Sequence, residues 1–177
     1  MLSKELNILD KDTWKNVYST KIKLIPDPIV SEFNYKLLNN LLNNNYFLSK
    51  WKQITPYCAI CPSIIENNKH LIYECRNIKY IWKIVSAYLN FDIIWKHIIV
   101  GFFNETNEKV NILNNILSVI ACRLYKYKMY CRLESLDETE YSIRYHLKSY
   151  LLFLYHVMKE NRSPTIARKY YEISTLL

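Results

Sequence analysis

The sequence is poor in the residues that make tight turns. It contains one glycine, Gly101, and five prolines among 177 residues. Two-residue β-hairpins and barrel corners rely on glycine, because glycine adopts left-handed backbone conformations without steric cost. Glycine-rich phosphate-binding loops need several glycines within a few positions. We therefore expect helices joined by Asn-rich loops, and the composition excludes phosphate-binding loops of this kind.

Familiar catalytic motifs are missing as well. The sequence has no adjacent pair of aspartates, no G-x-S-x-G turn and no H-E-x-x-H motif. Asp137, Glu138 and Glu140 look like the start of a helix rather than the acidic cluster of an endonuclease. Three histidines lie in apolar helical patterns, where we expect a structural role: His97, His146 and His156. We expect no enzyme in this chain, and an active site assembled from Asp and Glu stays open as an alternative.

Long apolar runs are absent too. The stretch Leu151–Tyr155 is followed by His156 and is far shorter than the roughly 20 residues of a membrane-spanning helix. The first residues, Met1–Glu5, carry no signal-type apolar region. We expect an intracellular protein, cytoplasmic or nuclear, without a membrane partner, in which Cys122 and Cys131 stay reduced.

The composition that remains is apolar and basic. Hydrophobic residues make up 50% of the chain and aromatic residues 15%, which excludes a disordered chain and supplies a core. The formal net charge is +8. This balance favours a polyanionic partner, RNA or DNA, over a small-molecule substrate, although many small basic proteins have no such partner.

Four residues that bind soft or borderline metals stand close together as C-x2-C-x8-H-x4-C: Cys58, Cys61, His70 and Cys75. Zn²⁺ prefers thiolate and imidazole ligands, and four of them close a tetrahedral structural site with no open position for chemistry. Three clustered cysteines also cannot all pair in disulfides. We predict a structural Zn²⁺ site. The alternative is buried free thiols beside an ordinary polar histidine.

The same residues carry a family resemblance. The ligands together with Glu66, Leu71 and Trp82 form a string that resembles the zinc-binding region of non-LTR (LINE-type) retrotransposon reverse transcriptases. That region follows the polymerase thumb. Upstream, residues 33–42 and Leu48 look like the family's helical lead-in, so the resemblance covers about residues 14–101.

Two positions depart from the family pattern. Asn67 stands where a Thr is usual, and Arg76 where a Pro is usual. Neither is a ligand, so they affect the local turn rather than the metal. The resemblance implies a module that positions template RNA or target DNA during target-primed reverse transcription, with the polymerase part of the same polyprotein as a partner. The paired aspartates of that polymerase are absent from this chain.

Apolar residues recur at helical spacing through most of the chain. The predicted fold is all-α, a small helical domain with a CCHC zinc knuckle followed by a helical hairpin and a short C-terminal helix. The first expected helix begins after an Asp12 N-cap. Four more span residues 29–43, 77–89, 91–100 and 108–132, and Gly101 ends the third of these. Two further helices begin after Asp137 and at Ser163-Pro164. The expected divisions are a lead-in at 1–28, a zinc-knuckle domain at 29–101 and a helical region at 108–177, the last two separate or one compact unit.

Two groups of basic residues are candidates for nucleic-acid contact. Steps of three and four place the first group on one face of the expected helix 77–89: Arg76, Lys79, Tyr80 and Lys83. Such a face suits a phosphate backbone and an unstacked base, and the alternative is a solvated face. The second group lies in the C-terminal half of the helix 108–132, where the helix dipole also favours cations: Arg123, Lys126, Lys128 and Arg132.

A protein-interaction role is the rival hypothesis. In that hypothesis the zinc only stabilises the fold, and the aromatic-rich helices after Gly101 bind another protein.

Overall fold

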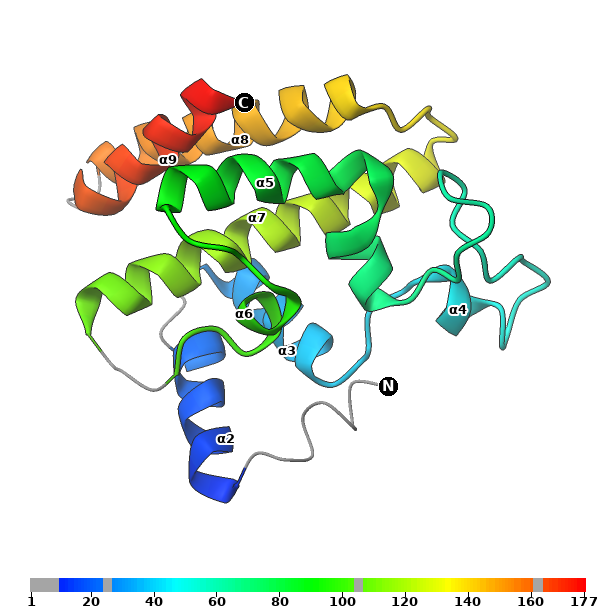
Figure 1. Cartoon of the computed structure of the whole chain (residues 1–177), viewed down its shortest axis with the longest axis horizontal. Helices are drawn as coiled ribbons and strands as arrows, with labels where there is room; N and C mark the ends of the chain where they lie inside the picture. Colours follow the sequence, from blue (N-terminus) through cyan, green and yellow to red (C-terminus); the bar gives the residue numbers. More distant parts are fainter. Residues whose placement is uncertain (1–9, 24–26, 104–106, 161–163) are drawn as a thin grey trace. The chain divides into compact units, whose positions relative to one another are not determined.

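The computed structural model describes residues 10–23, 27–103, 107–160 and 164–177. Within these ranges every regular element is helical, and an isolated antiparallel bridge joins Tyr57 to Ile65. The all-α prediction is confirmed. The elements, shown in Figure 1, are α2 (Lys11–Tyr18), η1 (Ser19–Lys23), α3 (Pro28–Leu38), α4 (Asn45–Leu48), η2 (His70–Glu74), α5 (Arg76–Leu89), α6 (Trp95–Ile99), α7 (Glu108–Leu133), α8 (Glu140–Glu160) and α9 (Pro164–Leu176); η1 and η2 are short π-helical turns.

The chain forms two compact units, each made from separate stretches. The first contains the described residues up to Asn43 and Ile94–Cys122; the second contains Asn44–Ile93 and Arg123–Leu177. This division differs from the expected linear one, because the long helix α7 contributes its first part to one unit and its last part to the other.

Helix starts follow local capping chemistry. Asp10, rather than the expected Asp12, caps α2 by accepting the backbone N–H groups of Asp12 and Thr13. Asp27 caps α3, whose first residue is Pro28. At α8 the cap is Thr139, which exchanges hydrogen bonds with Ser142 three residues on, instead of Asp137. The expected Ser163 cap of α9 lies outside the described residues, but Pro164 is the first helical residue as predicted.

Backbone conformation and close packing in the first unit explain why residue 101 is a glycine. Gly101 has a φ of 70°, the left-handed conformation expected just past α6. An added Cβ would lie 2.5 Å from Oδ1 of Asn114. That amide cannot move freely, because it accepts the N–H of Phe102 at 2.8 Å and donates to the Phe102 carbonyl at 2.9 Å.

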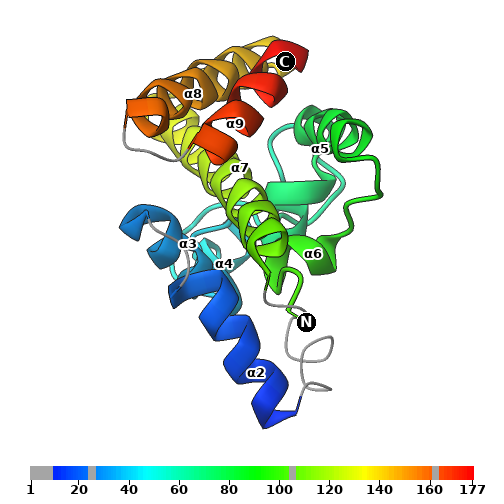
Figure 2. The ribbon, with the colours of Figure 1, turned by 90° about the vertical axis from the view of Figure 1, so that its left-hand side faces the viewer.

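The second unit is organised around α5, α8 and α9. Helices α8 and α9 run side by side, and α5 lies against both (Figures 1 and 2). The last part of α7 packs antiparallel to α8, as expected: Arg123 lies 4.1 Å from the Tyr150 ring centroid, and the Tyr127 and His146 centroids are 4.4 Å apart. One face of α5 is apolar and buried, and it carries Ile78, Ile81, Trp82 and Val85.

A buried lysine belongs to the first unit. Lys21 is 0% exposed. Its Nζ donates to Ser118 Oγ at 2.6 Å, and that hydroxyl donates to the Asn114 carbonyl at 2.6 Å. In the part of the chain that the structure describes, Lys21 forms no salt bridge. Burial without a counter-charge lowers the pKa of Lys21 to about 7.

We expect this lysine to make stability depend on pH. Between pH 7 and about 10.5 the unfolded chain binds a proton that folded Lys21 does not, so stability rises with pH by about 1.4 kcal/mol per unit. Below pH 7 both states hold the proton and this slope vanishes. Urea unfolding of wild type and Lys21→Met at pH 7, 8 and 9 should show the slope only in wild type. The exposed Lys23→Met variant is the control and should keep the wild-type slope, because it retains Lys21. Equal slopes in all three proteins would contradict the prediction.

Candidate metal centre

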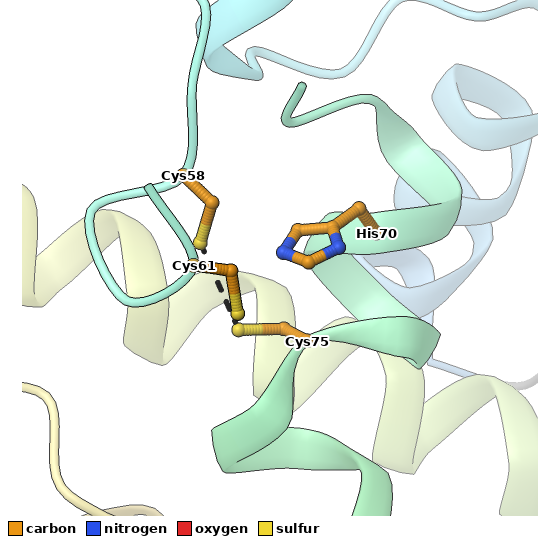
Figure 3. A group of neighbouring side chains, drawn as sticks. All are labelled: Cys58, Cys61, His70 and Cys75. Atoms are coloured by element: carbon orange, nitrogen blue, oxygen red, sulfur yellow. Dashed lines mark hydrogen bonds between the residues drawn. The ribbon is translucent and has the colours of Figure 1, made fainter. Parts of the chain in front are cut away.

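A short turn places two of the predicted ligands side by side. The bridge between Tyr57 and Ile65 closes the loop, and the N–H of Cys58 donates to the Ile64 carbonyl at 2.9 Å. The N–H of Ile64 in turn donates to the Cys61 carbonyl at 2.9 Å. The loop therefore brings the thiols of Cys58 and Cys61 to one side (Figure 3).

A π-helical turn places the other two. In a regular α-helix, residues five apart point about 140° away from each other. In η2 the N–H of Cys75 donates to the carbonyl of His70 at 2.9 Å, so one full turn separates the two residues. His70 and Cys75 consequently face the same direction, toward the thiols of the loop (Figure 3). An H-x4-C spacing suits this turn and not a regular helix.

Trp82 supports the π turn from α5. Its indole N–H donates to the carbonyl of Ile72 at 2.8 Å, and its ring lies 6.4 Å from that of Tyr73. The tryptophan of the family-like string thus fixes the backbone between two ligands without being a ligand.

The four ligand atoms converge. One ligand atom from each of Cys58, Cys61, His70 and Cys75 lies within 4.8 Å of the others, a separation at which they can hold one metal ion. The sulfurs of Cys58 and Cys75 are 3.8 Å apart, far beyond a disulfide bond. Two thiolates bound to one tetrahedral zinc are also about 3.8 Å apart, because each Zn–S bond is about 2.3 Å.

The environment of the cluster fits a metal rather than free thiols. His70 is buried, and among the residues that the structure describes neither ring nitrogen has a hydrogen-bond partner. An unsatisfied buried polar group costs about 1–3 kcal/mol, and coordination would satisfy one nitrogen. The hydrogen bond with Cys75 and burial raise the pKa of Cys58, whereas the hydrogen bond with Cys58 lowers the pKa of Cys75, with Lys128 acting in the same direction. The thiolate form is thus already favoured at Cys75.

One ion pair and one hydrogen bond to a ligand sulfur join the knuckle segment to the end of α7. Glu66 is 1% exposed; its carboxylate accepts the N–H of Asn45 at 3.0 Å and pairs with the guanidinium of Arg132. Lys128 is 2% exposed, with its Nζ 3.2 Å from Cys75 Sγ and 3.0 Å from Glu138 Oε1. Burial alone would lower the pKa of Lys128, but the negative charges of Glu138 and then Cys75 raise it above its ordinary value.

These positions revise the expected nucleic-acid contacts. Lys128 and Arg132 are occupied by acidic partners, and Lys128 has no exposed surface to offer a phosphate. Arg123 lies over the Tyr150 ring. Tyr80 is half-buried, with its hydroxyl donating to the Glu140 carbonyl at 2.7 Å, and burial raises its pKa. The residues that remain exposed are Arg76, Lys79, Lys83 and Lys126.

Sequence periodicity contained the signal for Lys128. Five residues of α7 recur in steps of four and three and share one face: Leu117, Ala121, Leu124, Lys128 and Cys131. All five are buried. A lysine in such a row is a buried cation and not a surface contact.

The Glu66–Arg132 pair has a measurable consequence. In Arg132→Met, Glu66 would stay buried without its counter-charge, and we expect a loss of up to about 3 kcal/mol in the free energy of unfolding. The double variant Arg132→Met/Glu66→Gln removes the charge but keeps an acceptor for Asn45, so it should recover part of that loss. Urea unfolding checks both. Equal losses in the single and double variants would show that the pair's charge is unimportant.

Comparisons with known proteins add no family to these observations. No helix in the described ranges is long and apolar enough to cross a membrane. No protein-family model, curated protein or solved structure matches the chain. Its function is therefore inferred from its own residues.

Proposed function

We propose that this chain is a non-catalytic nucleic-acid-binding module whose second unit is stabilised by a structural Zn²⁺ ion. The observation that carries the proposal is the convergence of three sulfurs and one imidazole within 4.8 Å. Zinc is the preferred ion for such a set, because it takes soft thiolate and imidazole ligands in a closed tetrahedron. Four protein ligands leave no open position for a substrate, which argues for a structural and not a catalytic ion.

The second element of the proposal is the surface that follows the centre. Helix α5 begins immediately after Cys75, and three exposed cations lie along its first turns: Arg76, Lys79 and Lys83. The structure describes no ion pair for these three side chains within its residues. Unpaired surface cations are free to displace counterions from a phosphate backbone. Arg76 is also positioned by a hydrogen bond from its guanidinium to the Ile60 carbonyl at 3.3 Å.

The family resemblance adds a biological setting to the proposal. A module of this kind would hold template RNA or target DNA for a retroelement polymerase during target-primed reverse transcription. The polymerase part of the same polyprotein would be its partner.

A protein-interaction role is the second candidate. Apolar side chains are exposed around the knuckle, with Trp51 at 79% exposure and others at lower values: Ile54, Ile64 and Ile65. An exposed apolar patch is typical of a protein contact site. In this candidate the metal only staples the loop that displays the patch.

Metal content tests the first part of the proposal. Protein purified without chelator should contain one zinc per chain, measured by elemental mass spectrometry, and Cys75→Ser should contain none. Because structural zinc contributes on the order of 10 kcal/mol, its removal should unfold the knuckle segment and lower the helical circular dichroism signal. Cys131→Ala, a change outside the cluster, should keep its zinc. Zinc-free wild type with unchanged stability would contradict the metal assignment.

A charge-reversal series tests the second part. Lys79→Glu/Lys83→Glu should weaken RNA binding in gel shifts and flatten the dependence of log K on log salt by about 1.4 for single strands, or 1.8 for duplexes. Lys52→Glu/Lys159→Glu makes the same change in net charge at exposed lysines elsewhere in the second unit and is the matched control. Equal slopes for wild type and the α5 variant would mean that this face is merely solvated. Concentration-dependent self-association without RNA binding would favour the interaction role.

A further inference from the structure

Lys128 stands between two groups of negative charge inside the second unit. Its Nζ lies 3.2 Å from Cys75 Sγ and 3.0 Å from Glu138 Oε1, and its side chain is 2% exposed. Lysine is rarely buried so completely unless its charge is paired. The ammonium is therefore held by the ligand sulfur on one side and by the α7–α8 connection, residues 134–139, on the other.

Charge balance gives this position a role at the metal centre. Three thiolates, a neutral imidazole and a divalent cation sum to a charge of −1. A net charge in a protein interior is costly unless a counter-charge lies beside it. Arg132 is committed to Glu66, and Arg76 is exposed. Lys128 contacts a ligand sulfur directly and can supply the missing positive charge.

The connection that holds Glu138 is also fastened to α5. Asn77 Nδ2 donates to the Glu138 carbonyl at 2.7 Å, and the Tyr80 hydroxyl donates to the Glu140 carbonyl at 2.7 Å. Both donors lie in the first turns after Cys75. The α7–α8 connection thus receives one contact from Lys128 and one from Asn77 of α5, while Tyr80 of α5 holds the first residue of α8.

We infer that Lys128 is the buried counter-charge of the metal centre and that, through Glu138, it couples metal loading to the order of the α7–α8 connection. This inference rests on the proposed metal site. It assigns a role to a residue outside the ligand set, and it makes residues 134–139 a segment whose order responds to metal. A partner that binds near this segment would therefore recognise the loaded form of the protein.

The first test is metal affinity, measured by competition with a chromophoric chelator. Lys128→Met should bind Zn²⁺ on the order of 10–100-fold more weakly than wild type, the usual effect of losing an outer-shell partner. Because Lys128→Met leaves Glu138 buried and unpaired, the double variant Lys128→Met/Glu138→Gln keeps the interior neutral and should show the same loss while remaining folded. Lys126→Met removes an exposed charge from the same helix and should bind normally.

The second test reports on the sulfur itself. In the Co²⁺-substituted protein, loss of an N–H donor to Cys75 Sγ makes the sulfur a better electron donor. The thiolate-to-cobalt charge-transfer band should therefore move to lower energy in both Lys128 variants and stay in place in Lys126→Met. A purely structural role of Lys128 would not move the band.

The third test follows the connection by hydrogen exchange. Residues 134–139 of wild type should gain protection when Zn²⁺ is added. Glu138→Gln should bind Zn²⁺ but gain less protection there, because the link to Lys128 is weakened. Unchanged zinc affinity in the folded double variant, or full protection in Glu138→Gln, would overturn the inference. A wild type that binds no zinc would instead refute the underlying metal site.

Discussion

The second unit depends on a cluster of buried polar atoms that need a binding partner. Three thiols and the buried imidazole of His70 meet in one cluster, and within the described residues both nitrogens of that imidazole lack a hydrogen-bond partner. Leaving such atoms unsatisfied costs free energy that a chain of this size cannot spare, since folded domains are stable by only about 5–15 kcal/mol. A bound cation would satisfy the three sulfurs and one of the imidazole nitrogens. The bridge at Tyr57 and the π turn at His70 then appear as the backbone arrangements that aim the ligands.

The two buried lysines show how neighbours decide what burial does. Lys21 has a hydroxyl partner and, in the described part of the chain, no carboxylate partner, and burial lowers its pKa to about 7. Lys128 is buried almost as completely, yet Glu138 and the thiols raise its pKa. The first lysine loses its charge within the physiological range, whereas the second keeps it. Only a lysine that keeps its charge can balance an anionic centre. Lys128 could therefore have this role in the second unit, whereas Lys21 could not have it in the first.

The ligand set and most helices could be predicted from the sequence because both follow from local spacing. The C-x2-C and H-x4-C steps brought Cys58 and His70 into the prediction, and glycine placement predicted the left-handed Gly101. Cap positions at α2 and α8 were missed by two residues, because several acidic and hydroxyl residues compete near each start. The two-unit division was out of reach, since it depends on which distant stretches pack together and not on any local pattern.

The net charge overstates the number of basic residues that are available for nucleic-acid contact. The net charge of +8 counts every cation equally, but Lys128 and Arg132 are taken up by Glu138 and Glu66. The exposed basic surface is therefore smaller than the sequence suggests, and three of its four remaining candidate residues lie in the first part of α5. That helix starts at a metal ligand, so a rigid Cys75 would fix the direction in which Lys79 and Lys83 point. A contact surface whose cations are oriented before binding loses less side-chain and backbone entropy when the partner arrives. A structural metal at this cluster would therefore contribute to affinity by fixing the orientation of the helix that carries the charges.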